Sequence, residues 1–326
     1  MSILQTAVTA KAHTNIALVK YWGKADQSLI IPTNDSISLT LDHFYTTTTV
    51  RFDAHLTADE ITLDGLTLPT DGQQRMRHFM DMIRHEAKIT TFAHIETANH
   101  VPTAAGLASS ASGFAALAGA AAKAAGLSTD RQYLSRLARR GSGSASRSLF
   151  GGFVHWHAGH DDASSFAEPL TEKVTWPIRM IAIVTSRAEK KIGSTNGMQA
   201  SQSSPYFADW VKTANADISP MTAALFKEDI KSVGEIAEHN AMSMHATTLS
   251  AEPPFTYFNS GSLQAMQAVQ DLRLTGVNCY YTMDAGPNVK VLCEAADVPA
   301  ILARLQPLFG SYNLVVAKPG PGLTYL

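Results

Sequence analysis

The sequence has few charged residues and no excess of either sign. Charged side chains make up 17% of its 326 residues, against about 25% in an average soluble protein. The formal net charge is -2. A chain so nearly neutral has no field over the whole molecule that would gather nucleic acid or an anionic membrane surface. Any site that binds anions must therefore be local.

Cysteine is scarce, and long apolar runs are absent. Cys279 and Cys293 lie outside any C-x-x-C or Cys/His metal spacing, and a single pair in a chain of this length is typical of a reducing compartment. The apolar run at residues 180–184 is far too short to cross a bilayer. The first residues contain no basic segment followed by a long apolar stretch. We therefore expect an unprocessed, soluble, cytoplasmic protein.

Apolar residues are plentiful and follow both helix and strand patterns. Hydrophobic residues make up 45% of the chain, which supports a sizeable core. A length of 326 residues indicates two domains, at roughly 100 to 200 residues each. Alternation predicts strands over 34–53, and Asp64-Gly65 predicts a hairpin over 61–68, whereas helical spacing predicts a helix over 73–88. We expect an α+β fold with an N-terminal lobe (1–190) and a C-terminal lobe (191–326).

Two further helices are predicted in the first half of the chain. An alanine-rich segment begins at Pro102, and Gly126 is suited to the position just after the helix end. The next helix is predicted to begin with Ser128 or Thr129 as its N-cap.

Small residues and two hydroxyls gather at 102–113, where a predicted strand turns into a helix. Free backbone N–H groups and the positive end of the helix dipole favour an anion there. Gly106 and the alanines let phosphate oxygens approach, while Ser109 and Ser110 can donate hydrogen bonds or contact a metal ion. The segment has neither the Walker A pattern nor the dinucleotide-binding glycine pattern. The alternative is a helix start whose small residues only permit close packing.

A second loop, GSGSASR at 141–147, combines glycine and serine with an arginine. Ser142 and Ser144 are suited to bind anionic oxygens, and Arg147 is suited to pair with a carboxylate through two parallel hydrogen bonds. A flexible linker is the alternative, but it does not explain an arginine beside an aromatic strand.

Two lysines and one aspartate complete the candidates from the residues alone. Lys20 and Lys24 lie four apart around an aromatic pair, with Asn15 just upstream, so they need an anionic partner or open solvent. Asp284 ends an apolar strand in MDAGPN, which is either a turn or a rigidly held catalytic carboxylate. Hydroxyls at 194–195 follow a basic pair and form either a loop or a third phosphate contact.

Seven stretches, in order from about residue 10 to residue 290, closely resemble the mevalonate diphosphate decarboxylases, a branch of the GHMP small-molecule kinase superfamily. They are NIALVKYWGK, PTNDSISLTL, PTAAGLASSASGFAALA, RRGSGSASRSLFGGF, STNGM, MHATTL and MDAGPN. The resemblance implies an N-terminal lobe of the ribosomal protein S5 domain 2 type and a ferredoxin-like C-terminal lobe, with the site between them. It also implies ATP, Mg²⁺, mevalonate 5-diphosphate as substrate and a homodimer.

The resemblance also implies a role for each matching residue. The ATP phosphates would lie on Pro102, Ala105, Gly106, Leu107, Ala108, Ser109 and Ser110, and Ser109 or Ser110 would also contact the metal. The substrate would be bound by Asn15, Tyr21, Lys24, Ser142, Ser144, Arg147, Ser194 and Thr195.

The catalytic group implied by the resemblance is Asp284, with Lys20 and Arg147. Asp284 would act as general base toward the 3-hydroxyl, Lys20 would keep it ionised, and Arg147 would hold the substrate carboxylate. Phosphorylation turns a tertiary alcohol, a poor leaving group, into a good one, which leaves with carbon dioxide.

Two positions depart from the family pattern, and two rival functions stay open. Asp35 and Gly193 stand where a serine and a hydroxyl residue are expected, which leaves details of substrate contact open. One rival is a GHMP kinase that phosphorylates a mevalonate derivative without decarboxylation, or a decarboxylase that prefers the monophosphate. The other is a non-catalytic nucleotide-binding protein on the same scaffold.

Overall fold

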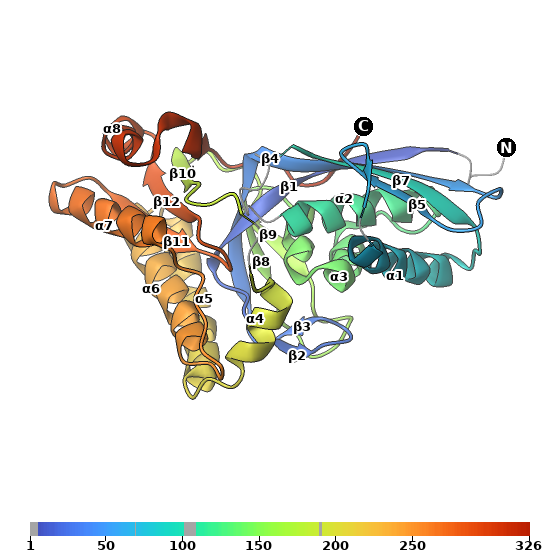
Figure 1. Ribbon diagram of the computed structural model, residues 1–326, viewed down its shortest axis with the longest axis horizontal. Coiled ribbons are helices and arrows are strands. Elements are labelled where there is room, and N and C mark those ends of the chain that lie inside the picture. Colours follow the sequence, from blue (N-terminus) through green and yellow to red (C-terminus); the bar gives the residue numbers. More distant parts are fainter. Residues whose placement is uncertain (1–5, 69, 101–108, 189–190) are drawn as a thin grey trace.

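The computed structural model describes residues 6–68, 70–100, 109–188 and 191–326. Its described part contains an eight-stranded sheet, a four-stranded sheet and a two-stranded ribbon, with helices packed against the two larger sheets (Figure 1). This arrangement confirms the predicted α+β class. The described part contains no helix that is long and apolar enough to cross a membrane.

The eight-stranded sheet is antiparallel apart from one parallel pair, β5 with β7. Its strands are β14 (Thr324–Tyr325), β1 (Val8–Val19), β4 (Ser36–Asp53), β7 (Phe92–His100), β5 (Glu60–Leu63), β6 (Leu66–Thr67), β8 (Phe153–Trp156) and β9 (Ala167–Thr171). The long β4 alternates buried and partly exposed residues over its second half, as its β-branched sequence predicts. The hairpin predicted at 61–68 is confirmed as β5 and β6.

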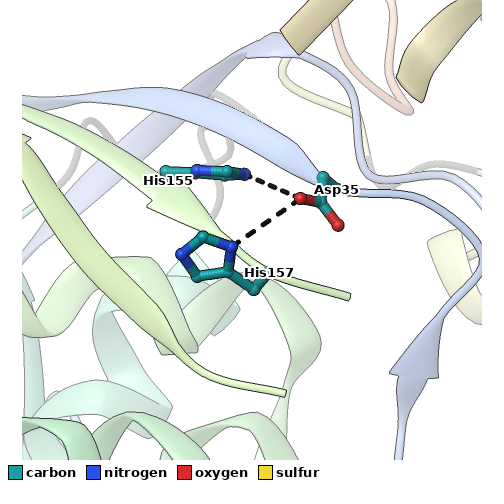
Figure 2. Close-up of side chains that lie close together, drawn as sticks. All are labelled: Asp35, His155 and His157. Atoms are coloured by element: carbon teal, nitrogen blue, oxygen red, sulfur yellow. Dashed lines mark hydrogen bonds and ion pairs between the residues drawn. The ribbon is translucent and has the colours of Figure 1, made fainter. Parts of the chain in front are cut away.

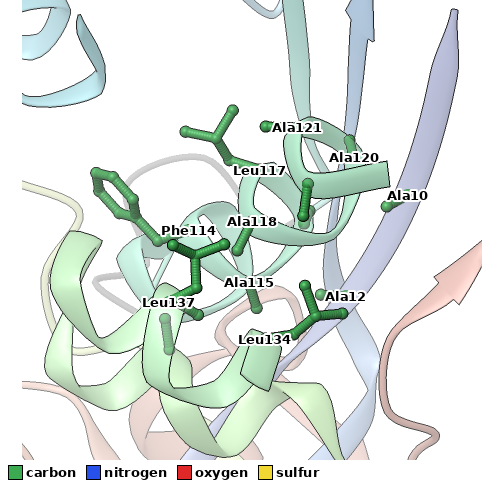
Figure 3. Packing of buried hydrophobic residues seen from close by; sticks show 14 of the residues in the cluster. Ala10, Ala12, Phe114, Ala115, Leu117, Ala118, Ala120, Ala121, Leu134 and Leu137 are labelled. Carbon is green, nitrogen blue, oxygen red and sulfur yellow. The ribbon is translucent and has the colours of Figure 1, made fainter. Parts of the chain in front are cut away.

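Three helices cover one face of this sheet: α1 (Thr70–Ala87), α2 (Ser109–Ala124) and α3 (Arg131–Gly141). Alanines of α2 are fully buried, and they let the helix pack closely on the small residues Ala10 and Ala12 of β1 (Figure 3). Gly126 follows α2 with φ +73°, so the predicted stop is confirmed. The N-cap predicted for α3 is wrong. Asp130 caps the helix instead, since its side chain accepts a hydrogen bond from Tyr133 N. The Ser128 hydroxyl lies before the helix and accepts a hydrogen bond from Asp130 N.

The four-stranded sheet is antiparallel, in the order β11 (Cys279–Met283), β12 (Val289–Glu294), β10 (Ile178–Ile183) and β13 (Leu314–Ala317). Its helices are α5 (Phe207–Phe226), α6 (Ile230–Leu249), α7 (Ser260–Leu274) and α8 (Val298–Phe309). Because β10 pairs with β12 and β13, residues 178–183 belong to this second sheet. The division at residue 190 stays a prediction.

One hydrophobic core joins the two halves. Ile16 and Leu18 of β1 share a cluster with Trp210 and Met221 of α5, so the end of β1 is held against the helices of the second half. The Lys20 backbone N–H, just past β1, donates to the Asn240 side chain of α6 over 2.8 Å. This packing fixes the position of Lys20 between the halves.

Candidate active site

A cavity of about 450 Å³ lies between the two halves of the molecule. Its lining contains every predicted catalytic and substrate-binding residue: Asn15, Lys20, Tyr21, Lys24, Ser142, Ser144, Arg147, Ser194, Thr195 and Asp284. A larger hollow of about 620 Å³ lies between α1 and α3, but it contains none of the predicted residues. The tertiary structure therefore gathers at one place side chains that are up to 269 positions apart (Asn15 to Asp284).

The cavity lining is strongly positive. It contains the cations Lys20, Lys24, Arg75 and Arg147, whereas Asp284 is the one carboxylate among the described lining residues. Sequence reasoning missed Arg75, which reaches the cavity from α1 and donates two hydrogen bonds to Gly141 O. A site with this balance of charge is suited to a substrate that carries several negative charges.

Asp284 immediately follows β11, and its carboxylate lies between two buried lysines. Oδ1 is 2.9 Å from Lys20 Nζ, and Oδ2 is 3.1 Å from Lys290 Nζ. Burial raises the pKa of the Asp284 carboxyl, but the charges and hydrogen bonds of the two lysines outweigh burial and hold that pKa well below its usual range. Asp284 is therefore ionised at neutral pH.

Sequence reasoning missed Lys290, although a signal was present. Lys290 lies on β12 opposite Thr282 of β11, and its side chain is buried. In the sequence it is a lone lysine within the apolar run VKVLC. A charge at such a position is almost never buried unless it is paired, so the run indicates a buried ion pair.

Lys20 is buried, which excludes the solvated-face alternative for this residue. Its Nζ donates to Ala17 O over 2.7 Å as well as to Asp284. Burial lowers the pKa of Lys20 to about 8, although the charge of Asp284 acts in the opposite direction. Lys24 is partly exposed and lines the same cavity.

Arg147 is also buried, and its guanidinium is held in place by other side chains. It lies in the short helix η2 (Gly143–Leu149), so the flexible-linker alternative for this segment is wrong. Its Nε donates to Asn15 Oδ1 over 3.0 Å, and its Nη1 donates to Ser36 Oγ over 2.6 Å. Burial, the largest cause, lowers the pKa of Arg147 to about 10, so it stays positively charged at neutral pH. Ser36 was not predicted from the sequence.

The start of α2 faces the same cavity. Ser110 lines it, with its hydroxyl oxygen 3.5 Å from that of Ser142. Ser109 is described as the first residue of α2. The other predicted phosphate-binding residues, Pro102, Ala105, Gly106, Leu107 and Ala108, lie outside the described residues. A helix start of this kind favours phosphate groups because its N–H groups and dipole face them.

The two departures from the family pattern lie at different places. Gly193 is the N-cap of α4 (Ser194–Ser201), and a Cβ added there would meet nothing within 4 Å, so a hydroxyl residue would also fit. Asp35 does not belong to the cavity lining. Its carboxylate accepts one hydrogen bond from Ala158 N and lies against His155 instead. Among the described residues, the departure at position 35 therefore lies outside the cavity lining, whereas Gly193 belongs to it.

Comparisons with known proteins agree with this arrangement. Residues 12–167 match the diphosphomevalonate decarboxylase-like N-terminal domain, and residues 180–318 match the mevalonate 5-diphosphate decarboxylase C-terminal domain. Human diphosphomevalonate decarboxylase is 37% identical to this chain over 322 residues, which cover 92% of this chain and 80% of the human protein.

Solved structures are also similar. The mevalonate diphosphate decarboxylase from Staphylococcus aureus has a TM-score of 0.95 at 42% identity, with 98% of each chain covered. The complex of MDDEF with MVAPP, AMPPCP and magnesium has a TM-score of 0.94 at 47% identity, again with 98% of each chain covered. Two matching domains, close relatives and a shared two-lobed fold show that this chain belongs to the mevalonate diphosphate decarboxylase family.

Proposed function

We propose that this chain catalyses the ATP-dependent decarboxylation of mevalonate 5-diphosphate to isopentenyl diphosphate, with ADP, phosphate and carbon dioxide as the other products. The observation that carries the proposal is the placement of Asp284, the single carboxylate in a cavity whose other charged residues, among those described, are all cations. The membership of the family and the bound MVAPP and AMPPCP of the relative MDDEF support it.

The substrate has two anionic ends, and the cavity offers a group for each. The diphosphate suits Lys24 and the hydroxyl-bearing residues Tyr21, Ser142, Ser144, Ser194 and Thr195. The carboxylate suits Arg147, whose Nε and Nη1 are bonded to Asn15 and Ser36 and are thereby oriented. Arg147 must not bind the carboxylate so tightly that the ground state is favoured over the transition state.

Asp284 is then the group that accepts the proton of the 3-hydroxyl. The hydroxyl oxygen forms a bond to the γ-phosphorus of ATP as the bond to ADP breaks, and the proton passes to the Asp284 carboxylate. In the next step the C3–O bond breaks and phosphate leaves, while the bond to the carboxylate carbon breaks and supplies the electron pair of the new double bond. A carboxylate of low pKa is a weak base, but phosphoryl transfer has a loose transition state in which the proton leaves late. Orientation therefore contributes more than basicity.

The described lining also fits ATP and Mg²⁺. It contains hydroxyl oxygens, which Mg²⁺ accepts as ligands, and no histidine or cysteine. We propose that the start of α2 holds the phosphates, with Ser109 or Ser110 contacting the metal. When bound, Mg²⁺ neutralises charge on the transferred phosphoryl group. We further propose a cytoplasmic location and a homodimer, which the low cysteine content and the family resemblance support.

The decisive measurement is the stoichiometry of products with mevalonate 5-diphosphate and MgATP. We expect ADP and carbon dioxide in equal amounts. ADP without matching carbon dioxide would favour a kinase, and ATP binding without turnover of any mevalonate phosphate would favour a non-catalytic protein. Faster turnover of mevalonate monophosphate than of mevalonate 5-diphosphate would indicate a decarboxylase that prefers the monophosphate.

The pH profile gives a second prediction. Because the pKa of Lys20 is lowered to about 8, Lys20 loses its proton as pH rises above that value, and the cavity loses a positive charge beside Asp284. We expect kcat/KM to fall above about pH 8 and the Lys20→Arg variant, which keeps its charge, to lose this descending limb. The measurement is kcat/KM from about pH 6 to about pH 10 for both proteins. If kcat/KM of the variant falls at high pH in the same way as that of the parent, the fall is caused by another titrating group.

A further inference from the structure

One group of histidine and carboxylate side chains lies outside the cavity and is not used by the proposed reaction. Among the described residues, three ligand atoms from Asp35, His155 and His157 all lie within 4.8 Å of one another. Figure 2 shows both imidazole rings directed at the same carboxylate. Asp35 immediately precedes β4, while the two histidines alternate along β8 and just beyond it, so they share one face.

The distances are close to those of a metal site. His155 Nε2 lies 2.9 Å from Asp35 Oδ2, and His157 Nδ1 lies 3.8 Å from the same oxygen. Ligands on bonds of about 2.1 Å in a tetrahedral zinc site lie about 3.4 Å apart. The two histidine–carboxylate separations fall on either side of this value, and all three ligand atoms lie within 4.8 Å of one another, so small side-chain movements would place them around one ion.

The surrounding hydrogen bonds orient these groups as ligands. Asp35 Oδ1 accepts from Ala158 N over 2.8 Å, which leaves Oδ2 directed at the rings. His157 Nε2 lies 2.8 Å from Glu168 Oε1 on β9, so Nδ1 faces Asp35. A carboxylate that binds the outer nitrogen of a histidine fixes its tautomer and raises its basicity, as is typical around metal-bound histidines. Two simple histidine–carboxylate ion pairs would not require both rings to converge on one oxygen.

We propose that Asp35, His155 and His157 bind a divalent transition metal ion of the zinc class, with Glu168 orienting His157. Two imidazole nitrogens and one carboxylate oxygen favour zinc, cobalt, nickel or copper over magnesium. The side chains of Asp35 and His157 are 28% and 33% exposed, so an ion can enter from solvent and a water molecule can complete the coordination. This site is separate from the Mg²⁺ of the proposed reaction.

A metal here would connect the β4 and β8 segments directly, and β9 through the contact of Glu168 with His157. Asp35 lies beside β4, His155 on β8, and Glu168 on β9. Ser36, the next residue after Asp35, accepts a hydrogen bond from Arg147. An ion bound to Asp35 would therefore restrain the segment that positions Arg147.

The test measures binding and does not depend on activity. The tag-free chain is treated with EDTA and titrated with Zn²⁺ in competition with a chromophoric chelator. We expect one Zn²⁺ per chain, no competition by Mg²⁺, and a loss of affinity of tenfold or more in Asp35→Asn, His155→Gln and His157→Gln, with a smaller loss in Glu168→Gln. The matched control is His94→Gln, because His94 contacts Asp53 and Glu60 without a second histidine; its affinity should equal that of the parent.

Two further measurements distinguish a loss of metal binding from a loss of folding in the variants. Zn²⁺ should raise the unfolding temperature of the parent and of His94→Gln but not that of His157→Gln, whose replaced side chain is partly exposed. Bound Co²⁺ should show visible bands of nitrogen and oxygen ligands without a sulfur charge-transfer band, since Cys279 and Cys293 are buried elsewhere. Absence of stoichiometric Zn²⁺ binding, or equal binding by parent and His155→Gln, would mean that the cluster forms ion pairs only and would overturn the proposal.

Discussion

Replacing Asp284 by asparagine is expected to lower kcat by on the order of 10² or more, within the range seen when a positioned acid–base group is lost. Asparagine keeps the shape of the side chain and one oxygen that accepts a hydrogen bond from Lys20 or Lys290. It cannot accept a proton, so the 3-hydroxyl would have to lose its proton to water. The measurement is the rate of ADP and carbon dioxide release at saturating mevalonate 5-diphosphate and MgATP, with binding of both ligands followed separately.

Folding must be checked in the same experiment, because the substitution leaves two buried lysines without their carboxylate. Breaking a buried ion pair from one side typically costs about 3–5 kcal/mol. Circular dichroism and the unfolding temperature report this loss, and Asp209→Asn, at an exposed ion pair on α5, is the matched control. We expect ligand affinities within about threefold of the parent. Weaker binding with unchanged kcat would show that Asp284 binds substrate and does not act in the chemical step.

Replacing Arg147 by lysine is expected to lower kcat/KM by on the order of 10² although the charge is kept. The guanidinium donates from Nε to Asn15 and from Nη1 to Ser36, and a single ammonium cannot reproduce both bonds while also holding a carboxylate. At least one of the Asn15 and Ser36 oxygens would then lose its buried donor. Steady-state kinetics with mevalonate 5-diphosphate measure the effect.

The control for this variant is Arg51→Lys. Arg51 lies on β4 and forms a partly exposed ion pair with Asp53, and neither residue belongs to the cavity lining. Its substitution should leave kcat/KM unchanged, since exposed ion pairs contribute little. Activity of Arg147→Lys within twofold of the parent would contradict the assignment of Arg147 to the substrate carboxylate.

Much of the fold follows from local patterns in the sequence. The alternation in 34–53 produced β4, and the spacing of apolar residues after Gln73 produced most of α1. The arginine among glycines and serines of η2 marked Arg147 as unusual, and a carboxylate at the end of an apolar strand marked Asp284. These features depend on a few neighbouring residues, so a single sequence is enough to find them.

Other features depend on how distant segments meet. Lys290 pairs with Asp284 because β11 and β12 form a hairpin, and Ser36 reaches Arg147 because β4 passes beside η2. The Asp35–His155 contact spans 120 residues and exists because β4 pairs with β8.

The sequence alone determined the type of chemistry, since hydroxyls, lysines, an arginine and one aspartate in these motifs already indicate a polyanionic substrate and a lone base. Only the tertiary structure decided the state of those groups. It buried Lys20, placed a second lysine against Asp284 and left Asp35 outside the cavity. The physical reason is that pKa values and ion pairs depend on burial and on neighbours in space. Strand pairing and helix packing fix both.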